Sequence, residues 1–164
     1  YGICSTDQNI VVSFEEPAMI QVMDCVWNVV NTISKDDTGT PLFEQPCYIT
    51  VSMEDSGEMI YVSDSVTITK VSLKGKVIST YNPQNWKRPS GLICVGKGQL
   101  LVNDFLGNTI DVVSDDGKDV ITLLDRSHGL HYLMALCYCT SWETLYIGSG
   151  WPVQAILVFK VSQK

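Results

Sequence analysis

The stretch that decides the fold runs from Pro46 to Tyr81 and reads PCYITVSMEDSGEMIYVSDSVTITKVSLKGKVISTY. It holds four short segments rich in β-branched, aromatic and other apolar residues, separated by turns that contain Gly, Asp or Ser. The four predicted strands are Pro46–Val51, Met59–Asp64, Thr67–Ser72 and Val77–Tyr81. Four strands in a unit of this length are typical of one blade of a β-propeller.

The same pattern recurs along the chain. A second copy begins at Pro89, 43 residues after Pro46, and less regular copies flank these two. The predicted strands of the other copies are Pro89–Val95, Gln99–Asp104, Thr109–Ser114, Val120–Leu124, Gly2–Cys4, Asn9–Phe14, Met19–Met23, Trp27–Ile33, Leu133–Tyr138, Thr144–Gly148 and Ala155–Val161. A repeat of about 40 to 45 residues is the period of propeller blades.

We therefore predict an all-β protein, a β-propeller with a single domain over residues 1–164. It has about four blades of four antiparallel strands, and the last blade lacks its outer strand. The blades cover approximately residues 1–33, 46–81, 89–124 and 133–161. Burial is expected to fall from the near-continuously apolar second strands, such as Met59–Asp64, through the more alternating third strands to the mixed fourth strands. No stretch has the sustained 3.6-residue period of an amphipathic helix.

Composition and charge limit the classes of function. The chain is 45% hydrophobic with a formal net charge of −7, so its composition is not that of a disordered protein. The acidic balance argues against a nucleic-acid partner, because phosphate binding needs clustered Lys and Arg. No apolar run is as long as a membrane span, and we expect no membrane partner. Since the chain begins without Met, we expect it to be processed or cut from a longer one.

Several phrases of the chain resemble NHL repeats, and most of all the C-terminal propeller of the tripartite-motif (TRIM-NHL) family. These phrases are Pro89–Val95 (PSGLICV), Ile60–Asp64 (IYVSD), Leu101–Asp104 (LVND), Asn108–Ile110 (NTI), Ser114–Lys118 (SDDGK), Lys70–Lys76 (KVSLKGK) and Ile156–Val161 (ILVFKV). The resemblance covers nearly the whole chain. It implies an NHL-type propeller that binds a protein partner, and a cytoplasmic location. The alternative location is secreted or extracellular, if the missing Met reflects processing.

The resemblance also leads us to predict that the chain is not an enzyme. The family's ligase activity belongs to RING and B-box modules, and this sequence contains neither. We predict no catalytic residue, no metal site and no cofactor. The two histidines, His128 and His131, are interpreted as loop residues, because a metal site needs more ligands than this pair. The six cysteines, four of them on first strands, are expected to be mostly buried and reduced.

The number of blades leaves other functions open. The family closes a ring of six blades, whereas only about four are present here. The chain could close a tight four-bladed ring, combine with other chains, or belong to a longer protein. The alternative function is therefore a structural, self-assembling protein, an oligomer or filament that uses open blade edges. A metal-dependent propeller lyase or hydrolase is the third hypothesis.

The predicted binding site is the rim formed by the loops that join successive blades. Such loops are longer than the hairpin turns and usually carry recognition in scaffolds of this kind. Trp and Arg are common anchors at protein interfaces. The predicted contact residues are Trp86, Arg88, His131 and Trp151.

Overall fold

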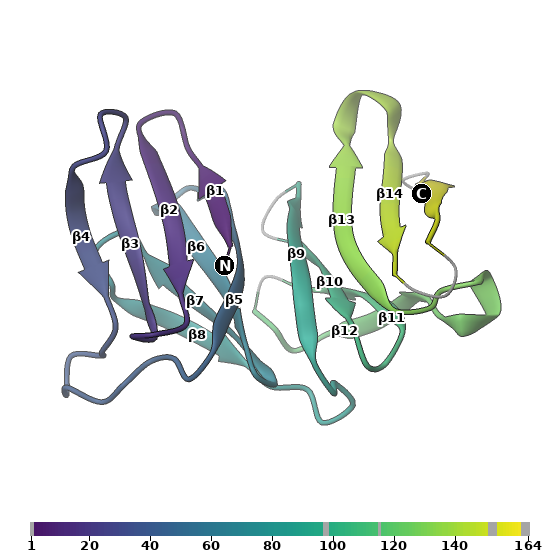
Figure 1. Cartoon of the computed structure of the whole chain (residues 1–164), viewed down its shortest axis with the longest axis horizontal. Helices are drawn as coiled ribbons and strands as arrows, with labels where there is room; N and C mark the ends of the chain where they lie inside the picture. Colours follow the sequence, from purple (N-terminus) through teal and green to yellow (C-terminus); the bar gives the residue numbers. More distant parts are fainter. Residues whose placement is uncertain (1, 97–98, 115, 151–153, 162–164) are drawn as a thin grey trace. The chain divides into compact units, whose positions relative to one another are not determined.

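The computed structural model describes residues 2–96, 99–114, 116–150 and 154–161, and places them in two compact units (Figure 1). Unit 1 spans Tyr1–Gln84 and unit 2 spans Asn85–Lys164. The strands of unit 1 are β1 (Ile3–Ser5), β2 (Asn9–Phe14), β3 (Met19–Asp24), β4 (Val29–Ile33), β5 (Pro46–Glu54), β6 (Gly57–Asp64), β7 (Thr67–Ser72) and β8 (Val77–Tyr81). The strands of unit 2 are β9 (Pro89–Val95), β10 (Gln99–Asp104), β11 (Thr109–Val113), β12 (Val120–Leu124), β13 (Leu133–Cys139), β14 (Thr144–Ser149) and β15 (Ile156–Lys160).

Every sheet is an antiparallel meander in chain order. Sheet 1 is β1-β2-β3-β4, sheet 2 is β5-β6-β7-β8, sheet 3 is β9-β10-β11-β12, and sheet 4 is β13-β14-β15. The described residues also form two short 3-10 helices, η1 (Arg126–His128) and η2 (Thr140–Trp142), but no α-helix. The predicted fold class, an all-β propeller with four blades and a three-stranded last blade, is confirmed.

In sheets 2 and 3, glycines close the hairpins between third and fourth strands. Gly75 lies between β7 and β8 with φ +88°, and Gly117 lies between β11 and β12 with φ +70°. L-residues with a Cβ rarely adopt this conformation, so these turns require glycine. Trp27 corrects one predicted boundary, because it sits in the β3–β4 turn with φ 70° and the fourth strand begins only at Val29.

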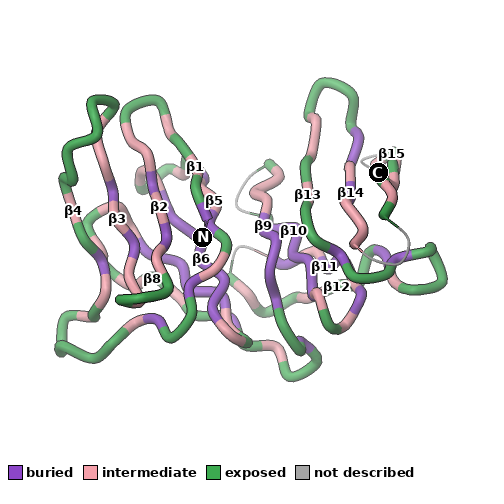
Figure 2. The backbone as a smooth tube through the Cα atoms, in the orientation of Figure 1, coloured by how far each residue is buried: buried purple, intermediate pink, exposed green. Residues whose placement is uncertain are grey.

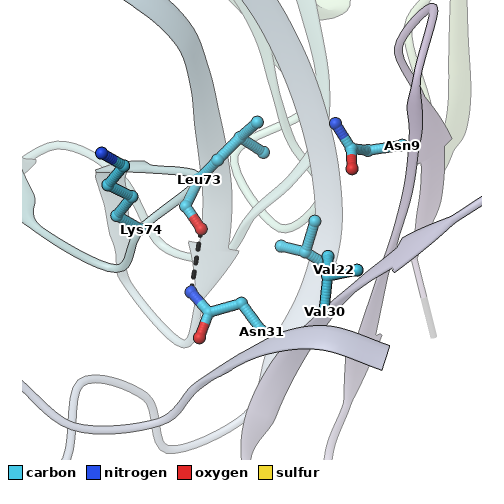
Figure 3. Close-up of a pocket in the computed structure, with 6 residues that line it drawn as sticks. All are labelled: Asn9, Val22, Val30, Asn31, Leu73 and Lys74. Atoms are coloured by element: carbon cyan, nitrogen blue, oxygen red, sulfur yellow. Dashed lines mark hydrogen bonds between the residues drawn. The ribbon is translucent and has the colours of Figure 1, made fainter. Parts of the chain in front are cut away.

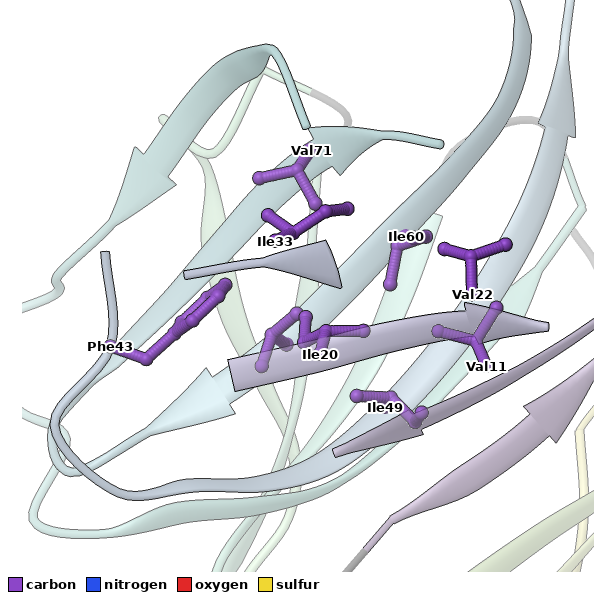
Figure 4. Close-up of a cluster of buried hydrophobic side chains, with 9 residues drawn as sticks. Val11, Ile20, Val22, Ile33, Phe43, Ile49, Ile60 and Val71 are labelled. Carbon is purple, nitrogen blue, oxygen red and sulfur yellow. The ribbon is translucent and has the colours of Figure 1, made fainter. Parts of the chain in front are cut away.

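Each unit has its own hydrophobic core between two sheets. In unit 1, Val11 and Ile20 of sheet 1 pack with Ile60 and Val62 of sheet 2 (Figure 4). In unit 2, Leu101 and Ile110 of sheet 3 share a cluster with Leu145 of sheet 4. Burying apolar surface in this way contributes about 25 cal/mol per Å². Sheet-on-sheet packing therefore stabilises each unit.

Burial is greatest on the second strands rather than on the first (Figure 2). β6 and β10 are almost wholly buried, whereas β13 is mostly exposed or half-buried. First strands are edge strands in these sheets, whereas every second strand has a neighbour on both sides. The expectation of buried cysteines is wrong for the same reason. Cys137 on β13 is exposed, as is Cys25 in a turn, and the other four are half-buried.

Candidate functional site

The candidate site is a surface at one end of unit 2, where three loops meet. β10 ends there at Asp104 and β11 begins at Thr109, while the loops before β9 and β13 reach the same end. We call the residues Arg88, Phe105, Leu106, His131 and Tyr132 the loop surface. Because adjacent strands are antiparallel, alternate connections of both sheets in unit 2 gather at this end.

A buried carboxylate holds the first loop against the second. Asp104 is only 1% exposed, and its two oxygens accept hydrogen bonds from the backbone N–H groups of Lys87 (2.9 Å) and Arg88 (2.8 Å). The N–H of Phe105 in turn donates to the carbonyl oxygen of Arg88 at 3.0 Å. A Cβ at Gly107 would collide with the Asp104 carboxylate, so the β10–β11 turn needs glycine there. These contacts fix the backbone on which Arg88 and Phe105 are displayed.

Arg88, Phe105 and Tyr132 form a continuous stack on this backbone. The Arg88 guanidinium lies 5.8 Å from the centre of the Phe105 ring, and the Phe105 and Tyr132 ring centroids are 6.0 Å apart at 57°. The first geometry is that of a cation–π contact, and the second is that of a tilted aromatic pair. Arg88 is exposed, Tyr132 is 49% exposed, and Phe105 between them is half-buried. A guanidinium and aromatic faces are therefore offered together to solvent.

The third loop is ordered by its own capping interactions. Asp125 caps η1, accepting from the N–H of Ser127 at 2.9 Å, while its Oδ1 lies 3.0 Å from Nδ1 of His128. Hydrogen bonds from Ser127, and then from His128, lower the pKa of the Asp125 carboxyl below its ordinary value. At the end of the loop, the Tyr132 N–H donates to Oδ1 of the buried Asn108 at 2.7 Å. Tyr132 is thus tied to the same turn as Phe105.

Two of the predicted contact residues belong to this surface. Arg88 is part of the stack. His131 is an exposed neighbour of Tyr132, and the carbonyl oxygen of His131 accepts a hydrogen bond from Ser149 Oγ at 2.6 Å. Trp151 lies outside the described residues. Whether Arg88, His131 and Trp151 bind a partner stays a prediction.

Trp86 is different from these residues, because its side chain is packed inside unit 2, and whether it contacts a partner stays a prediction. Its indole is 5% exposed, and Nε1 donates to Oδ2 of Asp111 at 2.9 Å. Asp111 is fully buried and also accepts from Thr122 Oγ1 at 2.7 Å. A side chain packed in this way supports the loop backbone and presents little surface to a partner.

Phe105 and Tyr132 were missed by the sequence analysis. Phe105 follows the conspicuous Asp104 at the end of a predicted strand, and Tyr132 directly precedes another predicted strand. Those positions in rim loops were the available signal. Their stacking joins residues 27 positions apart, which no local pattern reveals.

Unit 1 contains an open pocket of about 360 Å³ (Figure 3). Its apolar lining comes from Val22, Val30 and Leu73, and its polar lining from the remaining residues, Asn9, Asn31 and Lys74. The Asn31 amide donates to the Leu73 carbonyl oxygen at 2.9 Å and so holds the β7–β8 turn against sheet 1. One cation and two amides, both of which already donate hydrogen bonds within unit 1, give this pocket less recognition chemistry than the loop surface.

Among the described residues, no group of three or more His, Cys, Asp or Glu side chains is placed to hold a metal ion. His128 is occupied in the capping of η1. Nor does the described part of the chain contain a helix long and apolar enough to cross a membrane.

No protein-family model matches the chain, and no curated protein matches it in sequence. Solved structures do match. A streptogramin B lyase structure is similar with a TM-score of 0.71 and 13% identity, over 100% of this chain and 55% of that one. Virginiamycin B lyase from Staphylococcus aureus gives a TM-score of 0.64 and 16% identity, over 98% of this chain and 55% of that one. A catalytically inactive variant of that lyase with quinupristin gives 0.68 and 15%, with coverages of 98% and 55%.

These likenesses establish the propeller fold, and the chain spans about half the length of the structures that it matches. They also overturn the prediction that the chain is not an enzyme. That prediction depended on a resemblance to a family whose propeller carries no chemistry, whereas the solved structures found here are lyases. A fold that hosts both binding and catalysis does not decide between them.

Proposed function

We propose that the chain recognises an acidic segment of a protein or peptide at the loop surface of unit 2. The observation that carries the proposal is the contact of the exposed Arg88 and Tyr132 with the half-buried Phe105, held on a backbone that Asp104 fixes. A guanidinium can bind a carboxylate with two parallel hydrogen bonds, and aromatic faces bury apolar side chains beside it. Arg and Tyr are also the residue types that most often dominate binding energy at interfaces.

The distribution of charge supports an acidic partner. The chain carries a net charge of −7, yet the three loops around the surface, residues 85–88, 105–108 and 125–132, contain three cations and one carboxylate. The cations are Lys87, Arg88 and Arg126, and the carboxylate is that of Asp125. A basic patch on an acidic protein steers acidic partners toward that patch and repels them elsewhere. The resemblance of the repeats to NHL propellers agrees with a protein partner.

The test is to probe an array of short acidic, neutral and basic peptides with the labelled chain, and to measure the affinity of the best acidic peptide by fluorescence anisotropy. Arg88→Ala should lower the affinity for that peptide by about tenfold or more, since it removes the guanidinium that binds the carboxylate. The affinity of Arg88→Lys should lie between those of the wild type and Arg88→Ala, because lysine keeps the charge but loses the planar contact with Phe105. Lys76→Ala, an exposed lysine in unit 1, is the matched control and should change nothing. Equal binding by all variants, or no preference for acidic peptides, would reject the proposal.

A second candidate function is that of a propeller lyase. It is favoured by the match of the whole chain to a streptogramin B lyase structure with a TM-score of 0.71. The test is to incubate the chain with quinupristin, the compound present in one of the matching structures, and to follow the intact compound by mass spectrometry. Consumption that scales with protein concentration supports the lyase. An unchanged compound, with a known lyase active in parallel, rejects that substrate and leaves recognition as the function.

A further inference from the structure

The pocket of unit 1 lies between two sheets, and each of them contributes to its lining (Figure 3). Sheet 1 contributes Asn9 of β2, Val22 of β3 and two residues of β4, whereas sheet 2 contributes the β7–β8 turn. Val22 is only 2% exposed, and it belongs with Leu73 to the core cluster of unit 1. The pocket therefore opens the apolar core of this unit to solvent.

Two hydrogen bonds join the sheets on either side of the pocket. The Asn31 amide of β4 donates to the Leu73 carbonyl oxygen at 2.9 Å, and the Asn9 amide of β2 donates to Oε2 of Glu58 on β6 at 3.5 Å. Because β3 lies between β2 and β4 in sheet 1, the two bonds flank Val22. They hold the sheets at a fixed separation across the pocket, so the opening is a built feature of unit 1.

The charge offered to a ligand in this pocket is positive. Lys74 is the one ionisable side chain among the described residues that line the pocket, and it is exposed. Two carboxylates of unit 1 lie close by in the fold, but neither belongs to the lining. Glu58 accepts the hydrogen bond from Asn9, and Asp24 accepts hydrogen bonds from backbone N–H groups of its own turn. A ligand in the pocket therefore meets the ammonium group of Lys74 and not a carboxylate.

We infer that this pocket binds a small molecule with an apolar body and a carboxylate. The apolar body covers Val22, Val30 and Leu73, and the carboxylate pairs with the Lys74 ammonium. The volume of about 360 Å³ lies within the range of small-molecule sites, which are mostly apolar and carry only a few polar groups. The polar chemistry that is too sparse for a peptide is thus sufficient for a ligand of this size.

Heteronuclear NMR titrations with octanoate, octanol and octylamine test the inference, because these probes share one alkyl chain and differ in charge. Octanoate should bind about two- to fivefold more tightly than octanol, which is the range of a partly exposed ion pair, and octylamine more weakly than octanol. Lys74→Ala should remove the difference between octanoate and octanol while leaving the affinity for octanol unchanged. Lys74→Glu should make octylamine the tightest of the three. Lys76→Ala is the matched control, since Lys76 belongs to the same turn outside the lining, and it should keep the preference for octanoate.

The same titrations locate the site. The amide resonances of Val22, Val30 and Leu73 should shift with octanoate, and Arg88→Ala should not weaken this binding, which separates the pocket from the loop surface. Val30→Trp should fill the pocket and abolish binding, whereas Val29→Trp, at the neighbouring exposed valine outside the lining, should not. Both valines are exposed, so circular dichroism should show both variants folded. Equal affinity for the three probes, shifts confined to other residues, or no saturable binding at millimolar concentration would overturn the inference.

Discussion

In each unit, a buried aspartate at the end of a second strand holds the preceding loop, but the two loops display side chains of different charge. Asp64 ends β6 and accepts hydrogen bonds from the N–H groups of Glu44 and Gln45, just as Asp104 ends β10 and binds those of Lys87 and Arg88. The residues that the two loops carry to the surface differ completely. Unit 1 presents Glu44 and Gln45 where unit 2 presents Lys87 and Arg88.

The adjoining turns differ in the same way. After Asp64 the turn contains Ser65 and Val66, whereas after Asp104 it contains Phe105 and Leu106. The buried aspartate is repeated because its two hydrogen bonds hold each blade to the loop that precedes it. The displayed residues are not repeated, and loops on a rigid scaffold are where binding specificity commonly lies.

Removing either buried aspartate should have the largest effect on stability. Asp104→Ala and Asp64→Ala should each lower the free energy of unfolding by about 2–4 kcal/mol, because each removes two backbone hydrogen bonds to a buried charged group. Chemical denaturation monitored by tryptophan fluorescence measures the loss. At a temperature where both variants are folded, the Asp104 variant should no longer bind the acidic peptide selected above. The Asp64 variant should still bind it. Equal peptide binding by the two variants would contradict the assignment of recognition to unit 2.

A second variant tests how unit 2 is held together behind its surface. The Asn103 side chain is fully buried, and its Nδ2 donates to the Leu133 carbonyl oxygen at 2.9 Å, which links sheet 3 to sheet 4. Asn103→Ala should cost about 1–3 kcal/mol, because it strands a buried carbonyl group. Unit 1 has Ser63 at the corresponding place in β6. Ser63→Ala should lower the free energy of unfolding by less, since it deletes a hydroxyl rather than an amide group. The two midpoints in urea give the comparison, and a neutral Asn103→Ala would show that this link contributes nothing.

A milder change sharpens the contrast in charge. Lys87→Glu together with Arg88→Gln gives unit 2 the surface pair of unit 1, while the backbone N–H groups that bind Asp104 remain. Stability should change by no more than about 0.5 kcal/mol, because both side chains are exposed. Binding of the acidic peptide should fall by about tenfold or more, and its dependence on salt should weaken. Unchanged affinity in low salt would contradict the electrostatic part of the proposal.

The smallest expected effect concerns the charged turn between β11 and β12 of unit 2. A hydrogen bond and ion pair with Lys118, followed by a hydrogen bond from Ser114, lower the pKa of Asp116 to about 2. A carboxyl with a lowered folded-state pKa stabilises the turn above its unfolded pKa of 3.8 and loses that effect as the pH falls toward about 2. A carboxyl NMR titration should show this midpoint in the wild type. In Lys118→Ala the midpoint should rise, and an unchanged midpoint would exclude Lys118 as the cause.

The sequence predicted the strands of the middle copies well because local pattern decides them. The ranges Thr67–Ser72 and Gln99–Asp104 are strands with the predicted bounds, since short apolar runs end at Asp or Ser next to a turn. The predicted fall in burial from second through third to fourth strands is confirmed in sheets 2 and 3. The predicted burial of the first-strand cysteines failed, because burial depends on which strands lie at sheet edges. That is a property of the assembled sheets and not of any single segment.

The candidate site was only half predictable. Arg88 and His131 could be chosen because they lie in long loops between blades, and the structure places both on the loop surface. Trp86 could not be distinguished from an exposed anchor, because its partner Asp111 is 25 residues away. The stacking of Phe105 on Tyr132 is likewise a tertiary contact. Residue type and loop position thus identify candidates, while packing decides which of them reach solvent.

The most direct test of the central claim is a heteronuclear NMR titration of the labelled chain with the selected acidic peptide. We expect the amide resonances of Arg88, Phe105 and Tyr132 to shift on addition of the peptide, while those of Gln45 and Ser65 in unit 1 stay in place. Shifts confined to unit 1, or no saturable shifts at all, would contradict the claim.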